Sequence, residues 1–125
     1  MMNKIILIGR LTADPELRYT TNNNAVAQFT LAVDRPYVKD GQKETDFIRI
    51  ITWRTLAENC SKYLSKGRLV AVDGRLQIRS YEDRDGNRRT IAEVVANEVK
   101  FLESGSKRSE PSSDDFDVSD QDVPF

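Results

Sequence analysis

Aromatic and basic side chains share a face in two segments of the sequence. Within residues 44–54, the even-numbered positions suit the buried face of a strand, and the odd-numbered positions carry large rings beside a guanidinium: Phe47, Arg49, Ile51 and Trp53. The end of a later segment repeats this pattern with Arg75, Gln77, Arg79 and Tyr81. Sequence-tolerant binding of single-stranded nucleic acid needs flat rings on which any base can stack, with cations nearby for the backbone. The two segments therefore predict such a surface.

A further ring, Tyr37, lies beside Arg35 and just before the turn dipeptide Asp40-Gly41. We predict base stacking on four rings: Tyr37, Phe47, Trp53 and Tyr81. The candidate contacts to the nucleic-acid backbone are four arginines: Arg35, Arg49, Arg75 and Arg79. At about 1 to 3 kcal/mol for each stacked base, four rings would supply roughly 4 to 12 kcal/mol before ordering costs.

The alternative for these rings is a place in the core or at a subunit interface, where most large aromatics lie. The remaining rings fit core or interface positions better than a stacking surface: Tyr19, Phe29, Tyr63 and Phe101.

The spacing of apolar residues predicts five strand runs and one helix. Residues 25–34 alternate with period two, and residues 68–80 place four aliphatic side chains on one face: Val70, Val72, Leu76 and Ile78. Asn22 to Asn24, Asp40-Gly41 and Asp85-Gly86 are turn signals. Residues 55–66 change to helical spacing, with Thr55 and Glu58 as a capping-box pair and Gly67 as the end.

Three strand runs, a helix and two more strand runs give the element order of the OB-fold, a five-stranded Greek-key barrel. The predicted fold is therefore all-β, with one helix between the third and fourth strands. Gly9 and Gly74 interrupt strand patterns, as glycines do where a barrel strand bends.

Composition limits the chemistry. The chain has one cysteine and no histidine, so we expect no disulfide framework, no metal site, no cofactor and no catalysis. An apolar run of only four residues near the start, Ile5 to Ile8, is too short for a signal or membrane segment, and we expect the chain in the cytoplasm.

Charge divides the chain into parts. Residues 1–103 carry a net charge of +3 and residues 104–125 a net charge of −4. We expect a folded domain over 1–103, a flexible linker over 104–113 and an acidic partner-binding tip over 114–125. A merely solubilising acidic tail is the alternative.

The chain resembles the bacterial and phage single-stranded DNA-binding proteins over roughly residues 1–102 and at the extreme C-terminus. The similarity is carried by the opening Asn3 to Leu11, by Asp14 to Tyr19, and by four later segments: Phe29 to Val33, Tyr63 to Gly67, Val72 to Leu76 and Thr90 to Val94. The resemblance implies an OB-fold, a homotetramer, and binding of single-stranded DNA without catalysis. It also places the stacking aromatics on Tyr37, Phe47, Trp53 and Tyr81.

The resemblance further implies that an acidic tip docks replication, recombination and repair proteins. The residues of this tip are Asp120, Asp122, Val123, Pro124 and Phe125. Three features depart from the family pattern: Ile48 stands where some members have a histidine at subunit contacts, Asn22 to Asn24 replace a glycine-containing turn, and the linker is short. These departures leave the tetramer geometry and the chromosomal, phage or plasmid origin open.

Two other functions stay open at this point. A metal-dependent nuclease would need clustered carboxylates, for which the candidates are Asp14, Glu16, Asp83 and Asp85. An OB module that binds only proteins or structured RNA is the other.

Overall fold

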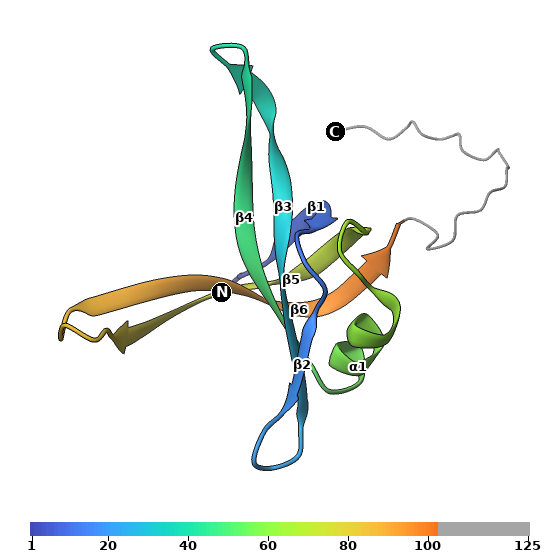
Figure 1. The fold of residues 1–125 in the computed structure, drawn as a ribbon, viewed down its shortest axis with the longest axis vertical. Coiled ribbons are helices and arrows are strands. Elements are labelled where there is room, and N and C mark those ends of the chain that lie inside the picture. Colours follow the sequence, from blue (N-terminus) through green and yellow to red (C-terminus); the bar gives the residue numbers. More distant parts are fainter. Residues whose placement is uncertain (103–125) are drawn as a thin grey trace, which may run out of the picture.

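The computed structural model describes residues 1–102, which form six strands and one helix. In chain order the elements are β1 (Ile5–Leu11), β2 (Glu16–Tyr19), β3 (Ala25–Lys39), β4 (Gln42–Trp53), α1 (Arg54–Tyr63), β5 (Leu69–Glu82) and β6 (Arg88–Phe101). Figure 1 shows that the β3–β4 and β5–β6 hairpins extend away from the centre of the molecule as two long arms, while α1 packs near its base.

Five strands close into a barrel. The strand order is β1-β5-β6-β4-β3, and β1 completes the ring by pairing with β3 at Arg10 and Leu11. The β4–β6 pair is parallel and the other pairs are antiparallel. The OB-fold prediction is therefore confirmed, with α1 between the third and fourth barrel strands. The short β2, which pairs with the outer part of β3, was not among the predicted strands.

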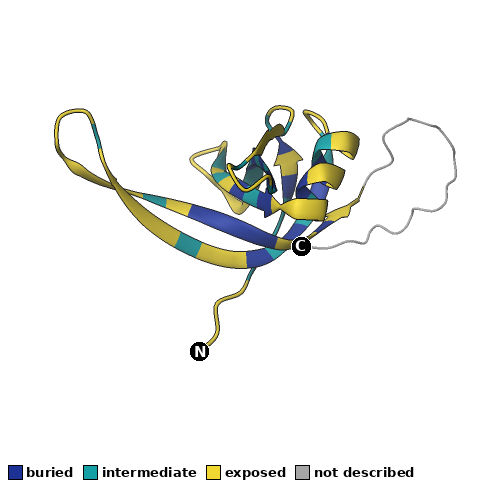
Figure 2. Ribbon diagram, turned by 90° about the horizontal axis from the view of Figure 1, so that it is seen from below, coloured by how far each residue is buried: buried dark blue, intermediate teal, exposed yellow. Residues whose placement is uncertain are grey.

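Aliphatic side chains from all five barrel strands fill the interior, where Leu31, Ile50, Val70, Val72 and Val94 are fully buried. Thr52 is also buried, and its hydroxyl donates to the Ala27 carbonyl at 2.9 Å, so the polar group is satisfied. Figure 2 shows that burial is concentrated where the strands form the barrel and that the arms are largely exposed.

The helix begins and ends at different residues from those predicted. Its N-cap is Trp53, whose side chain makes no capping hydrogen bond, so the Thr55 and Glu58 capping box was wrong. The helix ends at Tyr63, where the Leu64 amide donates to the Cys60 carbonyl at 2.9 Å. Gly67, the predicted end, lies beyond the helix and donates to the Leu11 carbonyl.

The same helix covers one end of the barrel. Ala57 packs with Ala25 and Ala27 of β3, and Cys60 joins the main core with no exposed surface. Burial raises the pKa of the Cys60 thiol to about 11. No helix within residues 1–102 combines the length and the apolar character needed to cross a membrane.

A bulge in the β5–β6 pairing at Asp73 and Gly74, where Asn97 of β6 is the extra residue, separates a barrel part of β5 from an arm part. A side chain at Gly74 would clash with the backbone of β6, because its Cβ would lie 2.3 Å from the Val95 carbonyl oxygen. Beyond the bulge, Leu76 and Ile78 are 43% and 58% exposed. They follow the same alternation along β5 as Val70 and Val72, but they are exposed because the strand leaves the barrel there.

The predicted turns are confirmed. Asp40 and Gly41 both have positive φ, 53° and 75°, as the two central residues of a tight hairpin turn of this hand require. Asn23 and Gly86 also adopt left-handed conformations, at 65° and 82°.

Candidate nucleic-acid interface

Strand register places the candidate residues of β4 and β5 on one face of the sheet, together with alternate residues of β6. Arg49 lies opposite Glu93, which in turn lies opposite Gln77, and Ile51 lies opposite Val95. Because alternate side chains point to one side of a strand, odd-numbered positions of the three strands share that side. We call this set the outer face: Phe47, Arg49, Ile51, Trp53, Arg75, Gln77, Arg79, Tyr81, Ile91, Glu93 and Val95.

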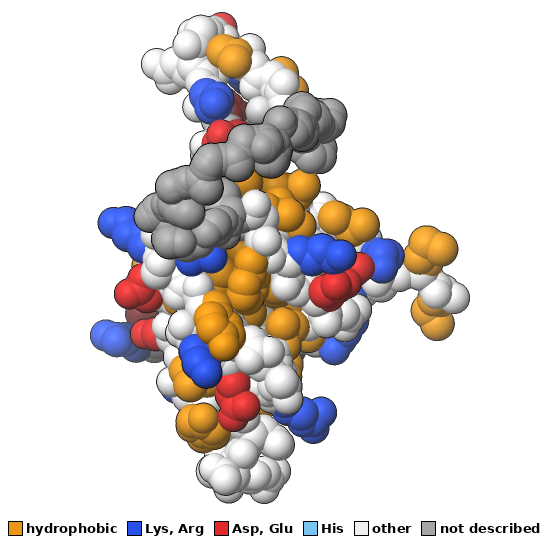
Figure 3. All heavy atoms as spheres, turned by 90° about the vertical axis from the view of Figure 1, so that its right-hand side faces the viewer, with side chains coloured by type: hydrophobic (Ala, Val, Ile, Leu, Met, Phe, Trp, Pro, Cys, Tyr) orange, Lys and Arg blue, Asp and Glu red, His pale blue; other side chains and the backbone are white. Residues whose placement is uncertain are grey.

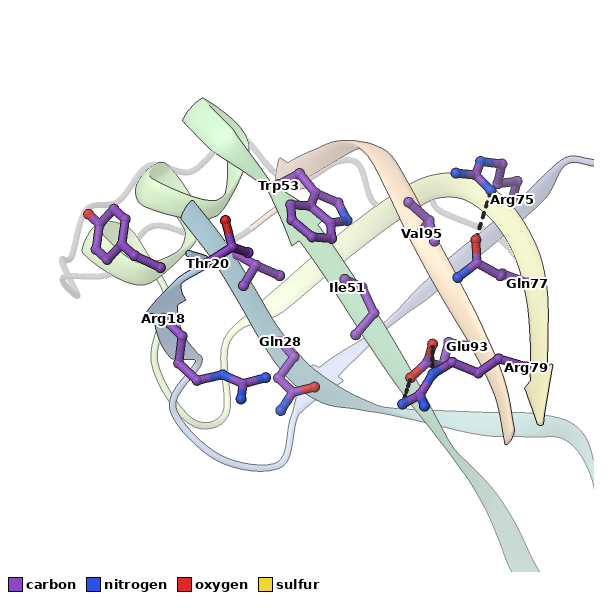
Figure 4. A pocket seen from close by; sticks show the side chains of 12 residues that line it. Arg18, Thr20, Gln28, Ile51, Trp53, Arg75, Gln77, Arg79, Glu93 and Val95 are labelled. Carbon is purple, nitrogen blue, oxygen red and sulfur yellow. Dashed lines mark hydrogen bonds and ion pairs between the residues drawn. The ribbon is translucent and has the colours of Figure 1, made fainter. Parts of the chain in front are cut away.

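A groove of about 550 Å³ crosses the outer face. Three of the eight candidate residues line it: Trp53, Arg75 and Arg79. Figure 4 shows the Trp53 indole and the Ile51 side chain on β4, with Val95 and Glu93 from β6 and the polar side chains of β5 beyond them. Together with Arg18 and Tyr19 from β2, the groove therefore joins two aromatic rings, an apolar floor and three guanidinium groups.

Trp53 ends β4 and is 42% exposed. Its partner in the register is Val26 of β3, which also lines the groove. The following residue, Arg54, has a φ of 59°, an unusual conformation for a residue other than glycine. The turn into α1 at this point leaves the indole partly accessible at the groove.

The other three rings are exposed but lie outside this groove. Phe47 is 68% exposed on β4, Tyr37 is 56% exposed on the β3–β4 arm, and Tyr81 is 43% exposed on the β5–β6 arm. Their alternative place in the core of the chain is ruled out by this exposure.

Two of the candidate arginines share a buried carboxylate. Arg79 donates from Nε and Nη2 to the two oxygens of Glu93, at 3.1 and 3.0 Å, and Arg49 Nη1 lies 3.6 Å from Glu93 Oε2. The pKa of Arg79 is raised above its ordinary value, chiefly by the hydrogen bonds to Glu93. Both arginines keep half-exposed side chains at the surface.

Arg75 and Arg35 differ in their partners. Arg75 donates to the neutral Gln77 side chain at 3.2 Å, and within residues 1–102 it pairs with no carboxylate. Arg35 binds Asp46 and Glu44. These two residues occupy even-numbered positions of β4, so their side chains point to the side of the strand opposite Phe47. Arg35 therefore lies off the outer face.

Several groove residues were not predicted from the sequence. Arg18, Tyr19, Gln28 and Glu93 all line the groove. Tyr19 is 55% exposed rather than part of the core, and it reaches the groove from β2, the strand that the sequence did not predict. The remaining rings divide: Phe29 is buried, whereas Tyr63 and Phe101 are exposed and pack together with ring centroids 6.3 Å apart.

The carboxylates considered for a nuclease serve structural contacts and lie in two places. Asp14 accepts the Lys66 amide at 2.8 Å near the base of the barrel. Asp83 accepts the amides of Asp85 and Asn87 and the Nε of Arg89 in the turn between β5 and β6. No group of three or more potential metal ligands gathers anywhere in residues 1–102.

Comparison with known proteins identifies relatives along almost the entire chain. Single-stranded DNA-binding protein 3 of Clostridium acetobutylicum is 54% identical over 115 residues, which cover 91% of this chain and 80% of that protein. The single-stranded DNA-binding protein of Caldanaerobacter subterraneus subsp. tengcongensis is 52% identical over 133 residues, covering 99% and 89%. Single-stranded DNA-binding protein A of Bacillus subtilis is 55% identical over 104 residues, covering 82% and 60%.

The match to a family agrees with these relatives and with the barrel. Residues 2–102 match the Single-strand binding protein family, a span that contains all six strands and the helix. The resemblance found in the sequence is thus confirmed, and the chain belongs to the Single-strand binding protein family.

Proposed function

We propose that this protein binds single-stranded DNA without sequence preference, and protects exposed strands during replication, recombination and repair in the cytoplasm. The observation that carries the proposal is the outer face, where β4 and β5 each present exposed rings and guanidinium groups on one side of the sheet. Bases can stack on such rings whatever their identity, while arginines contact phosphates. The names of the relatives support the same ligand.

The direct test is a titration of the full chain with poly-dT, followed by the fluorescence of Trp53, the sole tryptophan. Stacking of a base on the indole is expected to quench its emission, and labelled strands incubated with Mg²⁺ are expected to stay intact. Cleavage of the strands would instead favour a nuclease. Binding of structured RNA or protein without binding of poly-dT would favour an OB module of another class.

We also propose a homotetramer. Large apolar side chains are exposed on β1 and β5 outside the groove, including Ile6 at 63%, Leu76 at 43% and Ile78 at 58%. Figure 3, which views the side of the molecule opposite the β5–β6 arm, shows further hydrophobic side chains gathered in a band, with charged side chains on both sides of it. Exposed apolar surface of this kind is typical of interfaces. A native mass of four chains supports the tetramer, and a monomer mass would contradict it.

The final proposal concerns residues 104–125, which lie outside the described residues. The acidic tip, with Asp120, Asp122, Val123, Pro124 and Phe125, is proposed to recruit replication, recombination and repair proteins. The Phe125 ring and the carboxylates of Asp120 and Asp122 suit an apolar pocket with a basic rim. Deletion of residues 114–125 is expected to abolish recruitment and to leave or strengthen DNA binding. Weaker DNA binding after this deletion would contradict the proposal.

A further inference from the structure

Glu93 lies where a nucleic-acid groove would not be expected to carry an acid. It lines the groove from β6, opposite Arg49 of β4 and Gln77 of β5. Its side chain is only 4% exposed, beneath the guanidinium groups of Arg79 and Arg49, which are 48% and 44% exposed. A buried carboxylate needs partners of opposite charge, and these two arginines supply them.

Glu93 holds Arg79 more firmly than it holds Arg49. Both oxygens of Glu93 are held by Arg79, through its Nε and Nη2 at 3.1 and 3.0 Å, in the planar fork-to-fork geometry that defines an orientation. Arg49 is attracted to the same carboxylate from the neighbouring strand at 3.6 Å. Figure 4 shows the Arg79 guanidinium pointing toward the Glu93 carboxylate, with dashed lines marking the contacts between them. One acid thereby ties side chains from β4 and β5 to a common point on β6.

The pairing leaves the arginines able to bind a ligand. A guanidinium has five N–H donors, and two of those of Arg79 form hydrogen bonds with Glu93. Three donors therefore remain for a phosphate or a base edge. An arginine that is already oriented loses less rotamer freedom when it binds. The smaller loss of rotamer freedom favours DNA binding, but the charge of Glu93 opposes it. Glu93 lowers the net charge of the three side chains from +2 to +1, which weakens their attraction for the negatively charged strand.

We infer that Glu93 is a positioning residue for DNA binding, which orients Arg79 and Arg49 and thereby strengthens their contacts to the strand. This inference rests on the proposed function. It makes a prediction opposite to that of simple electrostatics, under which removal of a negative charge from the groove tightens the binding of DNA. It also differs from a role of Glu93 in the packing of β6 alone, for which the effect on DNA binding would not depend on the arginines.

The test uses the full chain with the Glu93→Gln substitution, which keeps the shape of the side chain and removes its charge. Affinity for labelled oligo-dT is measured by anisotropy at several NaCl concentrations, with circular dichroism and thermal unfolding as checks of the fold. We expect binding to weaken about three- to thirtyfold, the effect of releasing one or two rotamer-rich side chains. The salt dependence is expected not to decrease, because both cations remain.

Two controls locate the effect. Glu98→Gln removes an exposed carboxylate from the same strand, one that lies outside the groove and 3.8 Å from Lys100, and it is expected to leave affinity unchanged. In an Arg49→Met/Arg79→Met background, Glu93→Gln is expected to cause no further loss of affinity. An equal loss in that background would show that the effect is structural and would overturn the inference.

A second variant keeps the inference testable if Glu93→Gln does not fold. Arg79→Lys retains the charge but cannot form the two-point contact with Glu93, and we expect a comparable loss of affinity. Wild-type affinity in Arg79→Lys, or tighter binding by Glu93→Gln, would overturn the inference. Absence of oligo-dT binding by the unaltered chain would instead contradict the proposed function, so the two failures are distinguishable.

Discussion

Arg35 grips Asp46 with two parallel hydrogen bonds, from Nε to Oδ2 at 3.1 Å and from Nη2 to Oδ1 at 2.9 Å. Its third nitrogen, Nη1, donates to Glu44 at 2.7 Å. These contacts raise the pKa of Arg35. The hydrogen bonds to Asp46 are the largest cause, and the negative charge of Asp46 is the next. Two carboxylates therefore offset this cation on the β3–β4 arm, whereas Arg75 on the outer face has a neutral partner.

This contrast predicts different salt dependences for two matched variants. Arg75→Met is expected to reduce the slope of log affinity for oligo-dT against log salt by about 0.7, the value for one phosphate contact on a single strand. Arg35→Met is expected to change the slope by less than half of that amount, because the local carboxylates already balance its charge. Affinities measured over a series of NaCl concentrations provide both slopes. Equal slopes in the two variants would contradict the assignment of Arg75 to the groove.

Trp53 gives the second prediction. Trp53→Ala removes a ring from the groove and is expected to weaken oligo-dT binding by about 1 to 3 kcal/mol, or roughly 5- to 150-fold. Trp53→Phe, which keeps a smaller ring, is expected to lose less. Anisotropy of a labelled strand measures both.

Tyr63→Leu is the control for this pair. It removes a similarly exposed ring that packs against Phe101 outside the groove, and its DNA affinity should match that of the unaltered chain. If the two positions proved equally sensitive, stacking at Trp53 would not be the cause.

Much of the site followed from the sequence because period-two alternation assigns side chains to faces without knowledge of the fold. Ile50 and Thr52 are buried and Phe47 and Trp53 are exposed, as alternation predicted. Alternation does not show where a strand leaves the barrel, so it could not show that Leu76 and Ile78 are exposed while Val70 and Val72 are buried. Glu93 was missed for a related reason: its burial depends on arginines from two other strands, which only the closed barrel brings to it.

The register shift between β5 and β6 at Gly74 gives the third prediction, on stability. Gly74→Ala would place a Cβ 2.3 Å from the Val95 carbonyl oxygen and 2.9 Å from the Ala96 Cα, both backbone atoms that cannot move aside. We expect the free energy of unfolding to fall by about 1 to 3 kcal/mol, the usual cost of overpacking. Urea unfolding followed by circular dichroism measures the change.

Gly41→Asn provides the comparison. Gly41 has a φ of 75° and open space around it, and asparagine tolerates this conformation. The urea midpoint of the Gly41→Asn variant should stay close to that of the unaltered chain. A loss of unfolding free energy as large as that of Gly74→Ala would instead indicate that the chain tolerates no glycine replacement.

Acid pH gives the fourth prediction. The pKa of Asp46 is lowered by its hydrogen bonds to Arg35, and that of Asp83 by Arg89 and then by backbone amides. A carboxyl whose pKa is lower in the folded state stabilises the fold above its ordinary pKa of 3.8 and loses this contribution as pH falls through the folded value. An Asp46→Asn/Asp83→Asn variant should therefore melt below the unaltered chain near neutral pH.

The two melting temperatures should converge as the pH falls below 3.8, since protonation removes the same interactions from the unaltered chain. Thermal unfolding followed across a pH series from neutral to strongly acid measures the convergence. If the difference in melting temperature stayed constant down to about pH 2, the ionised forms of these two carboxyls would not be its cause.

The ends of α1 show a second limit of sequence analysis. Thr55 and Glu58 have the spacing of a capping box, yet the helix starts one residue earlier because β4 continues to Trp53 and the chain turns directly at Arg54. Local capping signals are weaker than the requirement that the strand and helix both reach the core, where Ala57 and Cys60 are buried. Sequence therefore identified the helix but not its first turn.

The sealed position of Cys60 makes the chain convenient for site-directed labelling. Its thiol is wholly enclosed and, with a pKa of about 11, stays protonated near neutrality, so it is a poor target for maleimide dyes. It is also the sole cysteine of the sequence. A single Ser80→Cys substitution on the exposed β5–β6 arm would consequently take up a fluorophore alone, and the emission of this label could be followed as DNA is added.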